Sequence, residues 1–124
     1  IIIIDCPPSL GAAVISSRCS VDEGIIPVAN DAYSCKGIEL TTTEIKEIRK
    51  TFGLKPLKVS ILSTMVDKRL NLSKEYEEKL NKKFGTIVLP FCIRTSSDFS
   101  KSLEKRETVY DAVAKTLFEF NKKG

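Results

Sequence analysis

The stretch Ile1-Ile-Ile-Ile-Asp5-Cys-Pro-Pro-Ser-Leu-Gly11 decides the fold class of this chain. Its four consecutive β-branched residues predict a strand that is buried on both faces, as strands of parallel sheets are. The strand is expected to end at Asp5, because the two prolines that follow cannot donate ladder hydrogen bonds. Open α/β sheets bind ligands at the carboxyl ends of their strands, so Asp5 is a candidate site residue.

The composition is ordinary for a single folded domain. Of the 124 residues, 42% are hydrophobic and 29% are charged, as in typical soluble domains. Histidine is absent from the sequence, which excludes nucleophiles activated by a Ser-His or Cys-His pair. No apolar run reaches the ~18–20 residues that a membrane span needs. The four cysteines are widely spaced without a C-x-x-C, so reduced thiols are expected rather than a zinc or redox site.

Charge is distributed unevenly along the chain. Residues 1–53 contain five Lys/Arg and seven Asp/Glu, whereas residues 54–124 contain fifteen and nine. The second part is therefore the source of the net charge of +4. This asymmetry is compatible with an anionic partner for the second part, but charge alone favours a solvated lysine-rich surface.

Apolar periodicity predicts an α/β fold with alternating strands and helices in one domain, residues 1–124. A partial, doubly wound, mostly parallel sheet flanked by helices follows from this order. Ser9 and Ser73 are predicted N-caps, and Gly53 and Gly85 are predicted helix ends. After the first strand, the pattern predicts helices near 10–20, 38–52, 73–84 and 108–121, and strands near 25–28, 57–64 and 86–89.

Four segments, in the same order, resemble the ParA/Soj (MinD-related) family, the deviant Walker A ATPases that partition plasmids and chromosomes. The first eleven residues are similar to its Walker B and switch II pattern, an apolar run followed by D-x-P-P-x-x-G. Residues 21–28 resemble A-D-x-V-I-I-P-V, and residues 64–73 resemble T-M-x-D with D-x-R-x-N-L-S. Residues 90–94 resemble I-P-x-x-V-R. The resemblance implies a P-loop-NTPase-like fold.

The resemblance assigns nucleotide chemistry to two groups of residues. It implies that Asp5 is a catalytic residue that holds Mg²⁺ through water, and that the Gly11 backbone lies near the γ-phosphate of ATP. A glycine at this place can also simply ease the turn. Asp67 is either a base-side contact or a cap of the next turn. The residues implied on the base and sugar side are Thr64, Met65, Asp67 and Pro90.

The resemblance also implies a surface that binds DNA without sequence specificity, through Arg69, Arg94 and Lys101. An exposed arginine can fork onto phosphate oxygens and release counterions, which suits such binding. Two positions depart from the family. After Arg94 the family pattern is only loosely kept, and Lys36 stands where the family commonly has glutamate near its dimer face.

The function implied is that of a cytoplasmic, nucleoid-associated partition ATPase. Its ATP-bound homodimer binds non-specific DNA, and a ParB-like centromere-binding partner triggers turnover; no membrane is involved. One alternative is a non-catalytic, truncated ParA-like interaction module. Another is a MinD-like regulator that holds a membrane with its last helix, although core packing is favoured for that helix.

The family's Gly-rich phosphate loop lies upstream of Walker B, and this sequence contains no G-x-x-x-x-G-K-[ST]. We therefore expect the chain to be the C-terminal part of a ParA-like domain, with ATP and Mg²⁺ bound only in the intact protein. Negligible hydrolysis is expected from these 124 residues alone, because Asp5 can position a metal only where phosphates are held.

Overall fold

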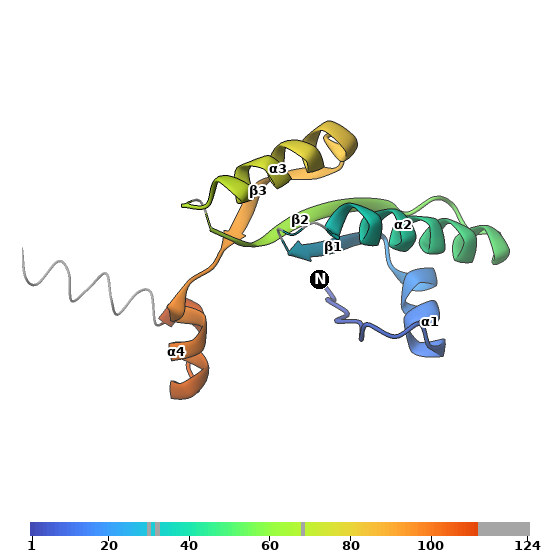
Figure 1. Cartoon of the computed structure of the whole chain (residues 1–124). Helices are drawn as coiled ribbons and strands as arrows, with labels where there is room; N and C mark the ends of the chain where they lie inside the picture. The colour runs from blue at the N-terminus through green and yellow to red at the C-terminus, as the bar shows by residue number, and fades with distance from the viewer. Residues whose placement is uncertain (30, 32, 68, 112–124) are drawn as a thin grey trace, which may run out of the picture. The chain divides into compact units, whose positions relative to one another are not determined.

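The computed structural model describes residues 1–29, 31, 33–67 and 69–111, which form four helices and three strands (Figure 1). The chain divides into two compact units, Ile1–Arg94 and Thr95–Gly124. In chain order the elements are α1 (Ala12–Ser20), β1 (Glu23–Ala29), α2 (Ser34–Thr51), β2 (Lys58–Val66), α3 (Asn71–Phe84), β3 (Val88–Arg94) and α4 (Ser97–Lys105).

The described strands of the first unit form a parallel sheet in the order β1-β2-β3. Ala29 at the end of β1 lies opposite Thr64 of β2, and Val66 at the end of β2 lies opposite Arg94 of β3. The carboxyl ends of the three strands therefore meet at one edge. This arrangement confirms the predicted α/β class with a parallel sheet flanked by helices.

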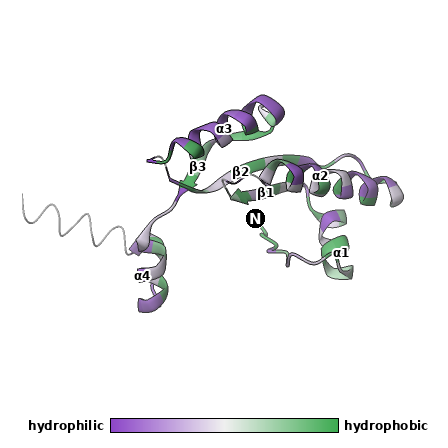
Figure 2. Cartoon of the chain, viewed as in Figure 1, coloured by the Kyte–Doolittle hydropathy of each residue, from purple (hydrophilic) through white to green (hydrophobic). Residues whose placement is uncertain are grey.

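The core of the first unit lies between the sheet and the helices α2 and α3. Val28 of β1, Ile38 of α2, Ile61 of β2 and Leu80 of α3 form one buried cluster, and Ile38 and Ile61 are fully buried. The strands are largely apolar, whereas α3 is mostly hydrophilic outside the side chains that pack on the sheet (Figure 2). Burial of this stripe stabilises the helices more than their intrinsic propensities do.

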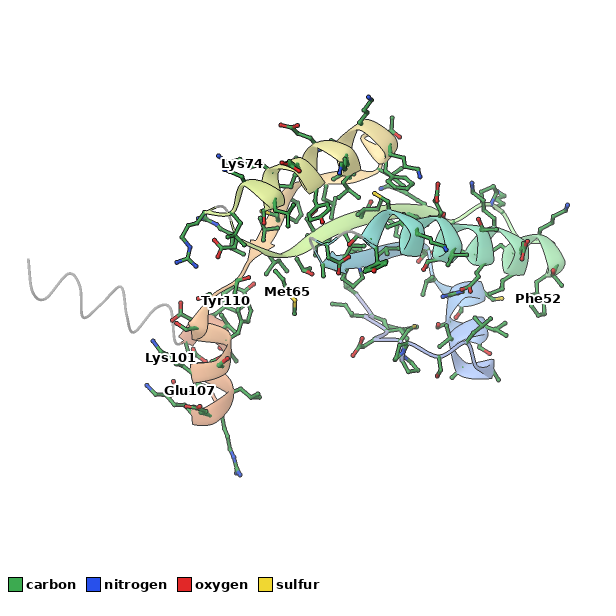
Figure 3. All side chains as sticks on the ribbon, viewed as in Figure 1. Phe52, Met65, Lys74, Lys101, Glu107 and Tyr110 are labelled. Carbon is green, nitrogen blue, oxygen red and sulfur yellow. The ribbon has the colours of Figure 1, made fainter. Side chains whose placement is uncertain are left out.

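The C-terminus of α2 follows the sequence prediction in its backbone but not in its packing. Gly53 has φ +65, the left-handed conformation that glycine supplies at helix ends. Ile38 and Ile45 of the predicted stripe are buried, but Phe52 is 59% exposed and projects from the end of the helix (Figure 3). The last residue of the stripe therefore lies beyond the sheet that buries the others.

The predicted strand at Ile1–Ile4 is wrong for this structure. All four residues are exposed and have no regular secondary structure. A strand of this composition is stable when other strands pair with it and helices cover both of its faces. None of the described residues pairs with Ile1–Ile4, so the local β-propensity alone does not form a strand.

The last strand, predicted near 86–89, extends to Arg94 and contains Pro90. The pairing passes from Ile61–Val88 to Ser63–Cys92, with a register irregularity between the two pairs. Between these pairs one residue of β2 therefore faces three of β3, and Pro90 is the middle one of the three. Proline is tolerated there because an edge strand and a bulge do not require its missing N–H.

Two helix-start predictions in the first unit are wrong. α1 begins after Gly11 rather than after a Ser9 cap. Ser73 is not the cap of α3 but a buried residue of its first turn. The predicted end of α3 at Gly85 is confirmed, and Gly85 has a right-handed helical conformation, φ −48.

The second unit contains a helix that the sequence pattern did not predict. The Ser96 side chain caps α4 by accepting a hydrogen bond from the Asp98 backbone N–H at 3.1 Å. The helix predicted to begin near residue 108 is capped there, because the Asp111 backbone N–H donates to the Thr108 hydroxyl at 3.2 Å. The rest of the helix predicted to residue 121 lies outside the described residues. Within the described part of the chain, no helix combines the length and apolar character needed to cross a bilayer.

Candidate functional site

The carboxyl edge of the sheet brings together most of the residues assigned to the nucleotide by the sequence. Thr64 lies at this edge, and its Oγ1 donates a hydrogen bond to the Val28 carbonyl oxygen of β1 at 3.0 Å. This bond ties the ends of β1 and β2 to each other. Pro90, by contrast, lies within β3 and precedes Cys92, the partner of Ser63. Of the four residues assigned to the base and sugar side, the structure therefore groups three, Thr64, Met65 and Asp67, and places Pro90 further back from the edge.

Met65 has an unusual backbone conformation next to this edge. Its φ is 56, a left-handed value that is uncommon for a residue with a long side chain. The Met65 side chain is 71% exposed and projects away from the ribbon (Figure 3). Residues with strained backbone conformations of this kind occur most often at functional sites. Sequence reasoning selected Met65 by resemblance only, because residue type does not reveal a positive φ.

Asp67 and Arg69 form a bidentate ion pair directly after β2. Arg69 Nη2 lies 2.7 Å from Asp67 Oδ2, and Arg69 Nε lies 3.0 Å from Asp67 Oδ1. The Arg69 backbone N–H also donates to Asp67 Oδ1 at 3.0 Å, so Asp67 caps the turn, as one of its two interpretations required. Hydrogen bonds from the Arg69 side chain lower the pKa of Asp67 to about 2, and the same bonds raise the pKa of Arg69.

The two arginines assigned to DNA follow neighbouring strand ends. Arg94 is the last residue of β3, opposite Val66 of β2, and its side chain is exposed. The Arg69 side chain is 89% exposed. Asp67 occupies one edge of its guanidinium, which leaves further N–H groups of the five available to another acceptor. Lys101 is an exposed residue of α4 in the second unit.

Asp5 and Gly11 lie in the segment before α1. The Cys6 sulfur and the Ser17 hydroxyl are 3.2 Å apart, which holds this segment against α1. Gly11 has φ −118, and a Cβ added to it would meet no atom within 4 Å. Neither its backbone conformation nor the space around it in this structure requires a glycine.

The described residues form only part of the metal and nucleotide site that the resemblance implies. They contain no group of three or more His, Cys, Asp or Glu that could hold a metal ion. Mg²⁺ is usually bound through one or two carboxylates together with substrate phosphates. Asp5 is a single carboxylate, and the described residues contain no such group of three or more around it, so these residues alone do not fit the complete group.

Comparisons with known proteins agree with the fold. Residues 1–61 match a protein-family model described as an AAA domain. The sporulation initiation inhibitor protein Soj of Bacillus subtilis is 34% identical over 99 residues, which cover 77% of this chain and 39% of that protein. The chromosome partitioning protein ParA of Myxococcus xanthus is 32% identical over 120 residues, which cover 92% of this chain and 41% of that protein. This chain thus spans about two fifths of the length of these curated relatives.

Proposed function

Because the chain belongs to the ParA/Soj family, we propose that it is part of an ATP-dependent partitioning protein that binds DNA without sequence specificity as a dimer. The observation that carries this proposal is the position of Arg69 and Arg94. Both are exposed and follow the ends of neighbouring strands, β2 and β3. Relatives named as chromosome partitioning proteins support the assignment of the same process to this chain.

The chemistry of the two arginines suits phosphate rather than base recognition. A guanidinium on an exposed loop can form bidentate hydrogen bonds to phosphate oxygens. Such contacts position a protein on DNA and carry no sequence information. Each one releases counterions, so binding that rests on them weakens steeply as salt rises. Lys101 of the second unit is assigned to the same function as a further phosphate contact.

ATP and Mg²⁺ are assigned to the complete protein. When bound, ATP would supply the phosphoanhydride bond, and its hydrolysis would end the DNA-bound state. Asp5 holds the metal through water in this proposal, and the Gly11 backbone lies near the terminal phosphate. Thr64, Met65 and Asp67 contact the base and sugar, with Pro90 beside the adenine. A ParB-like partner bound at a centromere-like site triggers turnover on the nucleoid.

The test compares DNA with membranes as the bound surface. The complete protein, of which this chain is a part, is mixed with two unrelated DNA duplexes of equal length, with and without ATP and Mg²⁺, and separately with anionic lipid vesicles. We expect equal retention on both duplexes, dependent on ATP, and none on vesicles. The double variant Arg69→Ala/Arg94→Ala should lose retention on DNA. Retention on vesicles that survives in this variant, without DNA binding by the wild type, would support a MinD-like regulator instead.

A further inference from the structure

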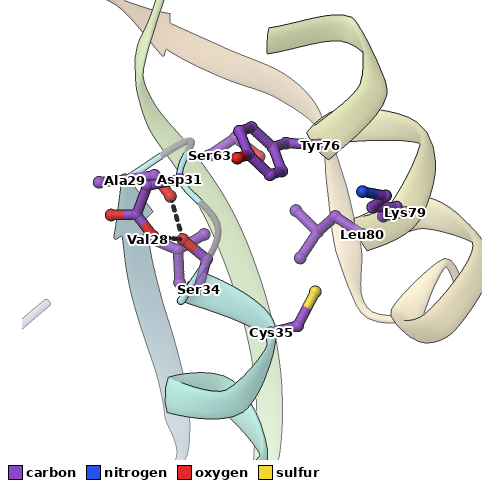
Figure 4. A pocket seen from close by; sticks show the side chains of 9 residues that line it. All are labelled: Val28, Ala29, Asp31, Ser34, Cys35, Ser63, Tyr76, Lys79 and Leu80. Carbon is purple, nitrogen blue, oxygen red and sulfur yellow. Dashed lines mark hydrogen bonds between the residues drawn. The ribbon is translucent and has the colours of Figure 1, made fainter. Parts of the chain in front are cut away.

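A pocket of about 260 Å³ lies between α2 and α3, next to the carboxyl ends of β1 and β2 (Figure 4). Its lining combines an apolar floor, which includes Leu80 of the core cluster, with polar side chains from three elements. The polar and reactive side chains of the lining are Asp31, Ser34, Cys35, Ser63, Tyr76 and Lys79. Apolar walls with a few convergent polar groups are typical of sites for small ligands.

Ser63 is the most informative member of this lining. It is only 7% exposed, it lines the pocket, and no described residue forms a hydrogen bond with its hydroxyl. The described residues contain no fully buried side-chain nitrogen or oxygen that lacks a partner, so the Ser63 hydroxyl is open to the pocket. A ligand atom in the pocket that accepts a hydrogen bond from Ser63 would take the place of solvent there.

Two more donors of the pocket are available to the same ligand. Lys79 Nζ lies 5.6 Å from the centre of the Tyr76 ring, and no described carboxylate forms an ion pair with it. The Tyr76 hydroxyl likewise has no hydrogen-bond partner among the described residues. The ammonium and the two hydroxyls all donate hydrogen bonds, so they favour a ligand that is rich in acceptors.

The acidic group of the pocket is already engaged. Asp31 Oδ1 accepts hydrogen bonds from the Tyr33 backbone N–H at 2.9 Å and from the Ser34 hydroxyl at 3.0 Å. Ser34 donates in addition to the Ala29 carbonyl oxygen. Asp31 and Ser34 therefore stabilise the start of α2, and the groups left without partners are those of β2 and α3.

We propose that this pocket binds a small organic anion, a carboxylate or phosphate ester on a compact apolar body. The anionic group contacts Lys79, Ser63 and the Tyr76 hydroxyl, and the apolar body rests on Leu80. The volume is below the 300–1,000 Å³ that is usual for drug-sized ligands, so a metabolite smaller than a nucleotide fits. Because successive side chains of a strand point to opposite faces, Ser63 and the neighbouring Thr64 serve different sites.

Cys35 provides the measurement, since it lines the pocket and is partly exposed. The alkylation of Cys35 in the purified protein by iodoacetamide is followed by mass spectrometry with added benzoate, phenyl phosphate or the neutral benzyl alcohol. An anion at about ten times its Kd should slow this reaction about tenfold, because only the empty pocket reacts. Cys92 of β3 does not line the pocket and is the internal control.

Variants of the pocket test whether it binds the anionic group of the ligand or only its apolar part. Ser63→Ala and Lys79→Gln should each raise the half-protecting concentration about tenfold or more, since each removes a hydrogen bond to a charged group. Lys82→Gln, on the same helix, should leave it unchanged. Ser63→Ala should leave the melting temperature close to that of the wild type, because no described residue forms a hydrogen bond with the Ser63 hydroxyl.

The outcomes decide the proposal. Protection by either anion that Lys79→Gln weakens supports it, and the anion that protects at the lower concentration identifies the carboxylate or the phosphate class. Equal protection by benzyl alcohol, an equal loss in Lys82→Gln, or the absence of protection by both anions would overturn it.

Discussion

Replacing Asp67 by asparagine should strengthen the binding of DNA. In the structure the carboxylate accepts from Arg69 Nε and Nη2 at 3.0 and 2.7 Å, so it competes with any phosphate for the same edge of the guanidinium. It also places a negative charge next to the proposed DNA surface. Asp67→Asn removes the charge and keeps an oxygen that can accept a weaker hydrogen bond. Arg69 is then free to act as a complete phosphate contact.

The size of the effect follows from counterion release. Each phosphate contact contributes about 0.9 to the slope of log K against log salt. If Arg69 becomes one additional full contact, the slope steepens by up to about 0.9, which corresponds to about a 3.5-fold greater loss of affinity between about 50 and 200 mM salt. The variant should therefore bind more tightly at low salt, and this advantage should shrink as salt rises.

Fluorescence anisotropy of a labelled duplex, titrated at several salt concentrations in one nucleotide state, measures this slope. Asp22→Asn is the matched control, since it makes the same change in net charge. Asp22 lies just before the amino end of β1, at the opposite edge of the parallel sheet from Arg69. An unchanged slope in Asp67→Asn, or an equal change in Asp22→Asn, would refute the competition between Asp67 and phosphate.

Three further predictions follow from the packing, the backbone and the ionisation of the first unit. Ile61→Ala should lower the free energy of unfolding by about 2–5 kcal/mol, because it opens a cavity at a fully buried site. Leu40→Ala, at an exposed site, should stay within about 0.5 kcal/mol of the wild type in the same urea titration. Gly53→Ala should cost about 1–2 kcal/mol, since φ is +65 and a Cβ there meets no atom within 4 Å, so the cost is conformational. Gly37→Ala, inside α2 with equal space, should instead stabilise by about 0.5–1 kcal/mol, and equal effects at the two glycines in thermal unfolding would contradict this reasoning. The pKa of Asp67 should be about 2 in a carboxyl-carbon NMR titration. Because this folded pKa lies below the ordinary value of 3.8, the stability from the pair is fully present above pH 3.8 and is lost as the pH falls toward 2. Titration of Asp67 near 3.8 in the folded protein would show that the pair does not form.

Sequence periodicity was sufficient for the fold class because it reports burial directly. The alternation around Ile61 and the helical stripe from Ile38 to Ile45 place these residues in the core, as the structure shows. Gly53 was predicted correctly as a helix end because its left-handed backbone is a property of one residue type.

The errors arise where structure depends on contacts that local sequence does not encode. Ile1–Ile4 have strong β-propensity but form no strand, since pairing with other strands decides that outcome. The last strand was predicted near 86–89, although the irregular register of β3 accommodates Pro90 and the strand continues to Arg94. The short helix α4 depends on the Ser96 cap rather than on a long apolar stripe.

The candidate site was predicted by resemblance, and its geometry came from the structure. The spacing of Asp67 and Arg69 did not reveal their ion pair, because the pair depends on the backbone conformation after β2, in which the Arg69 N–H donates to Asp67 Oδ1. The positive φ of Met65 and the position of Ser63 beside α3 are likewise products of tertiary packing.

The most direct test of the account is the salt dependence of DNA binding by Arg69→Ala/Arg94→Ala. Removal of two phosphate contacts should make the slope of log K against log salt shallower by about 1.8. Lys74→Gln/Lys82→Gln, which removes two exposed charges from α3, should leave the slope close to that of the wild type. A wild-type slope in the arginine variant, or the same loss in the lysine variant, would contradict the placement of the DNA surface at the carboxyl edge of the sheet.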